Sequence, residues 1–478
     1  MNVENKNHWI FIGYEAVSSL KEWLFLLIIL FFKVKWYYIV LACVIILIYS
    51  IIKWYNIKFY ISDEMLVYKQ GVLSRKKQEI PLDKISTVDM EQNLINRIFD
   101  VCNLKVDSGA VGDGQTEVKI TVKMDFAKKF REELLKSYKS SEEIKEDKSL
   151  KESYIKASMK DLAIYGITKN KLGWLVGLFA ILSQINEFLS EDFLNSIDNK
   201  AESFVNGIGD IAKNSTSIAF IVISVILVIL FLYIIVSVVS ILIEIIKYYN
   251  FTLYESSSKL NIEYGLITKK KYSLPIEKIQ ALKLKQNFLG QFLGLYNMEG
   301  IVIGYGDEDD KKAIIFPVAN EKLKNHIINT LLPEFNFEGH FNNPPKRAIF
   351  KFIVKRNIIS LILISPAVYF IPTIPLKLIL IGMCILSQIL LGYRNYKNTS
   401  IGLNRDVIVM SSGAVVKTTH LIKQKTVQSI GTKQNPLQRF RNVCNYKVDV
   451  CTNYFGEVVE VKHLECELIK EMEENLRV

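Results

Sequence analysis

The sequence lacks the residue patterns on which most catalytic and metal sites depend. The phosphate-binding pattern G-x-x-x-x-G-K-[ST], the nucleophile pattern G-x-S-x-G and the zinc pattern H-E-x-x-H are all absent from its 478 residues. Its five histidines are far apart in sequence, and its six cysteines form no C-x-x-C pair. Neither a zinc site nor a disulfide framework is therefore indicated. We expect a protein that is not an enzyme, with no catalytic residues, metal or cofactor.

Two other features are missing. The acidic run 307–310 lacks the glycine and the terminal glutamate of a calcium-binding loop, so we interpret it as the solvated tip of a hairpin. The first long apolar stretch is not followed by an A-x-A-like cleavage site. We therefore expect it to remain as a membrane anchor and not to be removed as a signal peptide.

What the sequence does contain is apolar surface and positive charge, in separate stretches. Half of the residues are hydrophobic, 23% are charged, and the formal net charge is +11. Long apolar runs alternate with mixed polar segments, as is typical of membrane spans joined to water-soluble domains. A positive charge suits nucleic acid or an anionic membrane surface. Given the apolar runs, we expect membrane lipids as partners and no nucleic acid.

One stretch occurs three times. A glycine is followed 21 residues later by a Gln-Asn pair in each copy, and further residues agree at the same offsets. An identical spacing in three copies indicates one domain repeated three times. The repeated positions are Gly71, Gln92 and Asn93 in the first copy, Gly265, Gln286 and Asn287 in the second, and Gly413, Gln434 and Asn435 in the third.

The repeats and apolar runs together predict the domain order. We expect a multi-domain membrane protein of three α+β modules, each preceded by a transmembrane helical hairpin. The expected segments are an N-terminal segment with hairpin one (1–54), module one (55–138), a charged linker (139–160), hairpin two (161–248), module two (249–332), a second linker (333–347), hairpin three (348–395) and module three (396–478).

Within each module, the local pattern predicts strands followed by a helix. Short segments rich in β-branched and aromatic residues are separated by turn residues, which is typical of a curved antiparallel sheet or a small barrel. After the last such segment of module one, Phe126, Phe130 and Leu134 recur every four residues behind Asp125, a suitable N-cap. We expect this C-terminal helix to cover the sheet.

The hairpins differ in whether their apolar runs are long enough to cross a membrane. Hairpin three (357–376 and 378–393) and the second limb of hairpin two (216–243) are long and apolar. The first limb of hairpin one (24–32) is short, so hairpin one either crosses twice or enters and returns; we favour two spans. Residues 1–22 are expected at the membrane surface.

Charge near the spans predicts the orientation. Lys and Arg flank hairpin three on the side of the modules, and the connection 187–215 within hairpin two carries six acidic residues against two lysines. Because positive charge accumulates on the cytoplasmic side, we expect a multi-pass protein of the cell membrane with its modules in the cytoplasm.

These residues resemble a known family. A glycine followed by a basic segment, then I-P-L-x-x-I, then Q-N-x-L-x-R, repeated after apolar hairpins, is similar to the bacterial pleckstrin-homology-like (PH-like), membrane-flanked domain family. The resemblance covers nearly the whole chain and implies a seven-stranded PH-like barrel with a C-terminal helix, but no reaction. The family arginine falls on Arg97 and Arg439, whereas module two has Gln291. Module three departs at Lys423-Gln424-Lys425-Thr426, which puts any shared role of that segment in doubt.

The Gln-Asn-x-x-x-Arg motif has two interpretations. In the first, the amides satisfy backbone groups where a strand ends, and apolar neighbours such as Ile98, Phe292 and Phe440 pack into the module. In the second, the motif forms a contact surface for a partner or headgroup. The spacing favours the first.

Basic triplets follow two of the three glycines. Arg75-Lys76-Lys77 and Lys269-Lys270-Lys271 occupy identical offsets, while module three has Lys417-Thr418-Thr419. Each cation near an anionic leaflet contributes about 1 kcal/mol, so the triplets are candidate lipid-facing residues. The alternative is a solvated strand edge that charge protects from pairing.

Two classes of function remain. The preferred one is a non-catalytic membrane scaffold or sensor whose modules bind anionic headgroups or a protein partner, such as a related membrane protein, in envelope-stress or antimicrobial defence as the resemblance implies. The alternative is a lipid or peptide transporter built on the six spans, for which Gln184, Ser224, Ser237 and Gln388 are the candidate polar path.

Overall fold

The structure is a computed structural model. It describes residues 4–22, 36–72, 74–85, 87–107, 118–136, 154–168, 218–256, 258–302, 313–370, 374–450, 457–469 and 472. The first limbs of hairpins one and two, the connection 187–215 and the acidic run 307–310 lie outside these residues, as does Gln184. The chain divides into two compact units, Met1–Ala157 with Asn250–Val478, and Ser158–Tyr249.

The smaller unit contains two described helices. The short helix α6 (Met159–Thr168) packs against the long apolar helix α9 (Ile218–Lys247). A Cβ atom at Gly166 would lie 2.6 Å from the Cα atom of Ile241, so the glycine permits this close approach.

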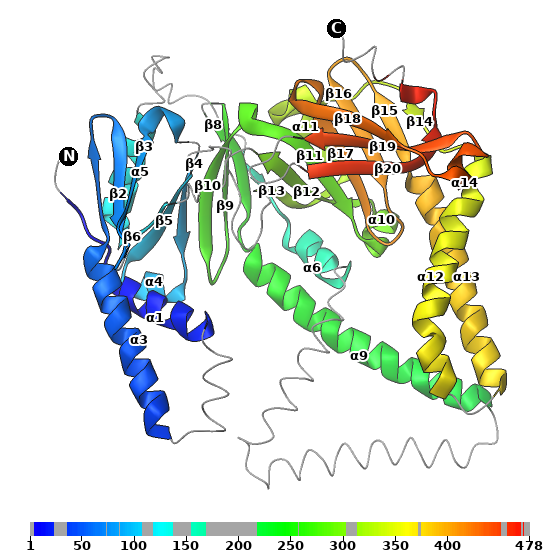
Figure 1. Ribbon diagram of the computed structural model, residues 1–478, viewed down its shortest axis with the longest axis horizontal. Coiled ribbons are helices and arrows are strands. Elements are labelled where there is room, and N and C mark those ends of the chain that lie inside the picture. Colours follow the sequence, from blue (N-terminus) through cyan, green and yellow to red (C-terminus); the bar gives the residue numbers. More distant parts are fainter. Residues whose placement is uncertain are drawn as a thin grey trace. The chain divides into compact units, whose positions relative to one another are not determined.

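The larger unit contains the three modules, which follow one order of elements (Figure 1). Each has three strands, a 3₁₀ turn, a fourth strand, a short helix, two more strands and, in modules one and two, a closing helix. Module one has β1 (Lys58–Ser62), β2 (Met65–Gln70), β3 (Lys76–Pro81), η1 (Leu82–Lys84), β4 (Thr87–Gln92), α4 (Leu94–Ile98), β5 (Val101–Asp107), β6 (Val118–Lys123) and α5 (Met124–Lys136).

Modules two and three repeat this order. Module two has β8 (Thr252–Ser256), β9 (Lys259–Tyr264), β10 (Lys269–Pro275), η3 (Ile276–Lys278), β11 (Ile279–Gln286), α10 (Phe288–Leu293), β12 (Leu295–Val302), β13 (Ala313–Asn320), α11 (Glu321–Leu331) and η4 (Pro333–Phe335). Module three has β15 (Ser400–Leu403), β16 (Val407–Ser412), β17 (Lys417–Lys423), η6 (Gln424–Thr426), β18 (Val427–Lys433), α14 (Pro436–Arg439), β19 (Val443–Val450) and β20 (Glu457–Glu465).

Module one has a core of its own. Buried side chains from its first three strands, including Phe59 and Leu66, pack with Leu104 and Ile120 of the other strands. Phe130 of α5 lies over them, with its ring centroid 5.5 Å from that of Phe59. The expected helix that covers the sheet is therefore present in module one, and its apolar face is the one that the four-residue spacing indicates.

The sheets do not follow the module boundaries. The last three strands of module one and the first three of module two form one antiparallel sheet, in the order β6-β5-β4-β10-β9-β8-β7, and modules two and three form β13-β12-β11-β17-β16-β15-β14 in the same way. The sheets β1-β2-β3 and β18-β19-β20 remain at the two ends. The expectation of one sheet or barrel for each module therefore needs correction: hydrogen bonding continues from module to module because β4 and β11 pair with the following module. At the second junction the core is shared as well, since Ala281 and Ile301 of module two belong to the buried cluster of module three.

A short strand precedes two of the hairpins. Ile155–Lys156 (β7) pairs with β8, and Phe341–Asn342 (β14) pairs with β15. Asn5 makes an isolated bridge to Phe59 at the corresponding place in module one. The stretches expected to be linkers therefore each contribute to the sheet of the next module, and part of residues 1–22 packs on module one.

Hairpin three consists of two helices side by side in Figure 1, after the 3₁₀ turn η5 (Lys346–Ala348). They are α12 (Ile349–Phe370) and α13 (Ile374–Asn398), and a Cβ atom at Gly392 would lie 2.9 Å from the Cα atom of Ile353. Near the N-terminus, α1 (Ile10–Glu22) contacts α3 (Trp36–Asn56). Among the described residues, one helix, Lys377–Asn398, is long and apolar enough to cross a membrane. A complete spanning hairpin before every module is thus not established.

Candidate functional site

The three repeated glycines have a backbone that other residues adopt with strain. Their φ angles are 125° at Gly71, 110° at Gly265 and 119° at Gly413. In each, an added Cβ atom would lie 1.9 Å from the carbonyl oxygen three residues later. The glycine is therefore required by the turn between the second and third strands of each module.

The motif glutamines tie a strand end to the strand that follows. Nε2 of Gln92 donates to the carbonyl of Val101 at 3.0 Å, and Nε2 of Gln434 donates to that of Val443 at 3.2 Å. Gln286 is buried at the end of β11. These bonds satisfy backbone carbonyls at the start of the next strand, which gives the amides a structural use.

The motif asparagines begin the short helices. Asn93 accepts from the backbone N–H of Asn96, and Asn435 forms a capping box with Gln438. Asn287 stands at the same position without a side-chain cap bond. The Tyr14 hydroxyl on α1 lies 2.9 Å from Oδ1 of Asn93, so the N-terminal helix docks at this motif.

Apolar residues in or directly after the short helices point outward, contrary to the expectation that they pack into the module. Ile98 is 78% exposed, Phe292 66% and Phe440 88%. Each short helix has few residues, and the position that is buried against the module holds Asn96 in α4, Gly290 in α10 and Gln438 in α14. Its apolar side chains are therefore left on the outside, at the same place in every module.

The position five residues after the motif glutamine joins one module to the next. Nη1 of Arg97 donates to the carbonyl of Leu266 at 3.0 Å. Nε2 of Gln291, at the same position in module two, lies 3.3 Å from the carbonyl oxygen of Ala414. Both carbonyls belong to the residue directly after the repeated glycine of the following module, so Arg97 and the divergent Gln291 make the same contact. Arg439, the third member, is exposed.

The two basic triplets have different surroundings. Lys269, Lys270 and Lys271 begin β10 and lie opposite Gln92, Glu91 and Met90 of β4. In module two this edge is therefore paired, and the idea that charge keeps it unpaired does not hold there. Arg75, Lys76 and Lys77 are exposed at the start of β3, which ends its three-stranded sheet.

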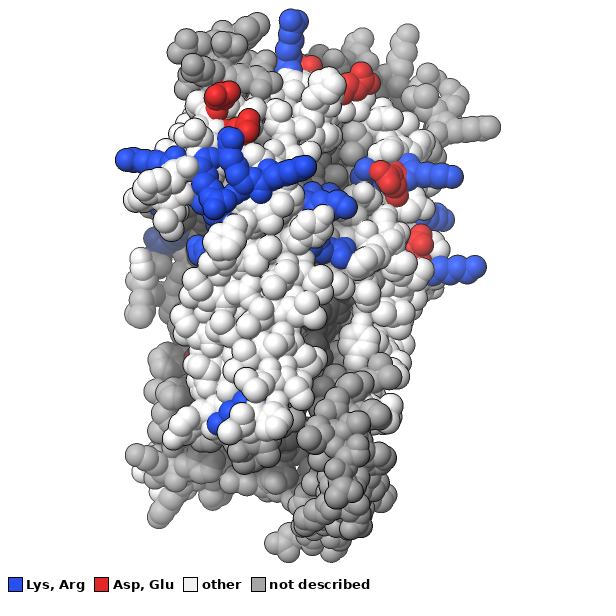
Figure 2. All heavy atoms as spheres, turned by 90° about the vertical axis from the view of Figure 1, so that its right-hand side faces the viewer, with Lys and Arg blue, Asp and Glu red and all other residues white. Residues whose placement is uncertain are grey.

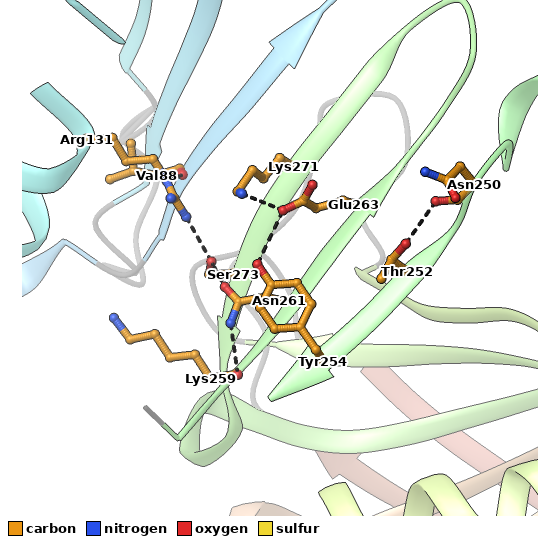
Figure 3. A network of polar contacts seen from close by, with 10 residues as sticks. All are labelled: Val88, Arg131, Asn250, Thr252, Tyr254, Lys259, Asn261, Glu263, Lys271 and Ser273. Atoms are coloured by element: carbon orange, nitrogen blue, oxygen red, sulfur yellow. Dashed lines mark hydrogen bonds and ion pairs between the residues drawn. The ribbon is translucent and has the colours of Figure 1, made fainter. Parts of the chain in front are cut away.

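A partly buried arginine crosses the first junction (Figure 3). Nε of Arg131 on α5 donates to the carbonyl of Val88 on β4 at 3.0 Å, and Nη2 donates to Oγ of Ser273 on β10 at 2.9 Å. Ser273 in turn donates to Oδ1 of Asn261. Burial lowers the pKa of Arg131, opposed mainly by the charge of Asp89. One side chain thus binds strands of two modules, and sequence periodicity alone does not single it out.

A buried lysine crosses the second junction. Lys423, where modules one and two have proline, is 2% exposed, and its Nζ lies 2.5 Å from Oε2 of Glu334 and 3.3 Å from the carbonyl oxygen of Ile276. Burial lowers its pKa, whereas Glu334 raises it. The departure of module three from the family pattern therefore has a structural use: it supplies a cation to module two.

A cavity of about 950 Å³ lies beside α13, lined by residues of α10, α11, α13 and β17. Arg394 stands on its wall, with its guanidinium 4.7 Å from the ring centre of Phe288 and 4.1 Å from that of Phe292. Lys397 and Lys417 also line it, and Glu321 is the one carboxylate among its lining residues. Its volume lies in the range of small-ligand sites.

Electrostatics within the cavity favour an anion. Nε of Arg394 donates to Oε1 of Gln291 at 3.0 Å, which fixes the guanidinium in place. Burial lowers the pKa of Lys417, and the nearby charge of Lys324 lowers it further, while Glu321 opposes both effects. An anion bound between these groups would compensate the cost of holding a partly desolvated cation.

Positive charge extends beyond the cavity. Figure 2 shows Lys and Arg side chains in a band across the face that carries hairpin three, next to a largely uncharged surface. Hairpin three contributes five cations near the ends that join module three: Lys351, Lys355, Arg356, Arg394 and Lys397. An apolar helix that ends in such a band is typical of a membrane span at the headgroup level.

Comparison with known proteins agrees with this architecture. The family model described as "Bacterial PH domain" matches residues 23–138, 206–329 and 359–477, which include most of the three modules. The chain is 25% identical to the UPF0699 transmembrane protein YdbT of Bacillus subtilis (strain 168) over 408 residues, covering 82% of this chain and 78% of the relative. The chain therefore belongs to the bacterial PH domain family, with the domain repeated three times.

Proposed function

We propose that this chain is a non-catalytic, multi-pass membrane scaffold whose modules lie against the cytoplasmic face of the membrane and bind anionic lipid headgroups. The observation that carries the proposal is the cavity beside α13. It places three cations, Arg394, Lys397 and Lys417, at the end of the helix that is apolar and long enough to span.

The chemistry of the cavity fits a lipid better than a free anion. Its cations lie beside apolar residues of α13, such as Leu390 and Leu391, and beside the exposed rings of α10. A phospholipid offers a phosphate and acyl chains together, so it would satisfy both surfaces. The outward-facing apolar residues of α4, α10 and α14 would likewise contact the interfacial region of the bilayer.

The alternative of a transporter has less support. Ser237 donates to the carbonyl of Tyr233 on its own helix, and Oε1 of Gln388 lies 3.4 Å from Nε of Arg356. These two residues of the candidate polar path therefore have bonding partners close by. A role in envelope-stress or antimicrobial defence remains part of the proposal through the family alone.

Retention of lipid by the full-length protein tests the proposal. The protein is extracted from vesicles of phosphatidylcholine with phosphatidylglycerol, and the lipids that remain bound are counted by native mass spectrometry. Because each cation near an anionic lipid contributes about 1 kcal/mol, Arg394→Gln and Lys417→Gln should each lower phosphatidylglycerol retention about fivefold. Lys322→Gln, on the exposed part of α11, is the matched control. Equal retention of both lipids by the wild type would refute headgroup selectivity.

A further inference from the structure

The two junctions between modules are built in the same register. In the first, Gln92 of β4 lies opposite Lys269 of β10; in the second, Gln286 of β11 lies opposite Lys417 of β17. Each glutamine is the motif residue, and each partner is four residues after the repeated glycine of the next module. The two junctions are therefore the same interface formed twice, with residues at equivalent positions paired in each.

A second contact strengthens each junction at the same place. The side chain five residues after the motif glutamine reaches the carbonyl directly after the next glycine, from Arg97 to Leu266 and from Gln291 to Ala414. Both the strand pairing and the turn contact thus recur. In each junction, the fourth strand of one module (the accepting edge) pairs with the third strand of the following module (the accepted edge).

The two three-stranded sheets of the larger unit each end in a strand that corresponds to one side of a junction. Strand β18 ends one three-stranded sheet and β3 ends the other, and within the described residues no strand pairs with the outer edge of either. Four of the seven residues of β18 are exposed, whereas β11 at the same place in module two is mostly buried. Arg439 holds the place of Arg97, and the turn at Gly71 holds the place of those at Gly265 and Gly413.

We propose that a second copy of this chain pairs its β3 with β18 of the first, which extends the series of modules from one molecule to the next. The repeated register places Gln434 opposite Arg75 and Thr432 opposite Lys77, and Arg439 reaches the carbonyl of Val72. The partner is a second copy because the accepting edge and the accepted edge are both present in every chain. Such head-to-tail contacts are heterologous, so they produce dimers, trimers and longer species or closed rings.

One pair limits the strength of this contact. The register places Lys76 opposite Lys433, where the first junction has Lys270 opposite Glu91. Like charges directly opposite each other in a sheet are unfavourable. The association is therefore reversible and becomes stronger as salt screens the repulsion. Confinement of both copies to one membrane raises their effective concentration.

Disulfide cross-linking of the full-length protein in vesicles tests the register. Lys77→Cys and Thr432→Cys are combined, and the yield of intermolecular cross-links is compared with each single variant. We expect a ladder of dimers and larger species from the double variant only. The matched control combines Lys77→Cys with Gln428→Cys, four residues out of register on the same strand, and should give no ladder.

A substitution that strengthens the association provides a second test. Lys433→Glu restores the charge pair of the first junction and should raise the dimer fraction about threefold or more at low salt. Light scattering of the otherwise wild-type protein in detergent measures this without introduced cysteines. A chain that stays monomeric with and without Lys433→Glu would overturn the proposal. Cross-linking of the single Thr432→Cys variant to itself would also overturn it, since that indicates a symmetric contact.

Discussion

Gly413 has a φ angle of 119°, and a Cβ atom added to it would lie 1.9 Å from the carbonyl oxygen of Val416. Two costs therefore add, backbone strain and a direct clash with main chain. We expect Gly413→Ala to destabilise the protein by about 2 kcal/mol or more. A thermal melt of the full-length protein followed by far-UV circular dichroism measures this as a lower midpoint.

The control for this substitution is Gly13→Ala in α1, where no atom lies within 4 Å of an added Cβ. Alanine is also the better helix former, so its midpoint should stay the same or rise slightly. Equal midpoints for the two variants would contradict the structural requirement for glycine at the repeated turn.

His463 is expected to make stability depend on pH. Burial lowers its pKa to about 4, with further lowering by Lys351, Lys462 and Lys355. Nε2 of Gln438 lies 2.9 Å from Nδ1, so the neutral ring accepts the bond. Because the folded pKa lies below that of the unfolded chain, the stabilisation is present above about pH 6.5. It is lost as the pH falls toward 4.

The expected loss is on the order of 1 to 3 kcal/mol, since one pKa unit corresponds to about 1.4 kcal/mol. Melting midpoints measured from pH 7 to pH 4 would show it. His463→Asn is the variant of choice because His463 has a positive φ of 63°, which asparagine tolerates. The variant should have a flatter pH profile. A profile as steep as that of the wild type would assign the effect to other groups.

At the scale of elements, Arg131 is expected to hold β4 and β10 together. Its guanidinium binds Val88 and Ser273, one on each strand, and is partly buried. Arg131→Met keeps the apolar stem but removes both bonds, so the junction should open more often. Hydrogen exchange of the amides of β4 and β10 should become several-fold faster, while exchange in β1 and β2 stays unchanged.

Lys129→Met provides the control, because Lys129 is exposed on the same helix. It should leave exchange at the junction unaltered. Faster exchange spread over all of module one in the Arg131 variant would point to a general loss of stability, and the specific role of Arg131 at the junction would then be wrong.

The elements of each module could be predicted from the sequence, whereas their pairing across modules could not. Alternating apolar residues indicate which face of a strand is buried, as in β5, but carry no information on which strand lies at its edge. The orientation of Ile98 and Phe440 was predicted wrongly for a related reason. An apolar residue in a short helix satisfies the pattern of a core residue and of a membrane contact equally well.

The cavity beside α13 could be predicted only in part. Arg394 and Lys397 stand out as charges at the end of an apolar run, but their meeting with Lys417 depends on the fold, since β17 lies against β11. The spacing of Gly71, Gly265 and Gly413, by contrast, was sufficient to predict the repeats. A backbone constraint requires glycine at one fixed position of each repeat, whereas the residues that line a cavity are far apart in the sequence.

At the scale of the whole molecule, the shared sheets constrain how the chain crosses a membrane. Strand pairs such as β4 with β10 and β11 with β17 cannot form through about 30 Å of hydrocarbon. The three modules must therefore lie on one side, and the chain crosses an even number of times between them. With 30 residues, α9 is about 45 Å long, which exceeds the thickness of the hydrocarbon. Because module two begins directly after α9, a crossing by α9 requires another crossing between module one and α9.

Labelling by a membrane-impermeant maleimide in intact cells tests this topology. Cysteines are introduced singly at Asp83, Lys322 and Arg405, which are exposed residues of modules one, two and three. All three should react only after the cells are opened, because the shared sheets hold the modules on one side of the membrane and the proposed orientation makes that side cytoplasmic. Ile374→Cys, at the far end of hairpin three and 71% exposed, should react from outside. Reaction of all three module sites in intact cells would reverse the orientation but leave the sheets in place. Reaction of one module alone would separate that module from the others and rule out the strand pairing that joins them.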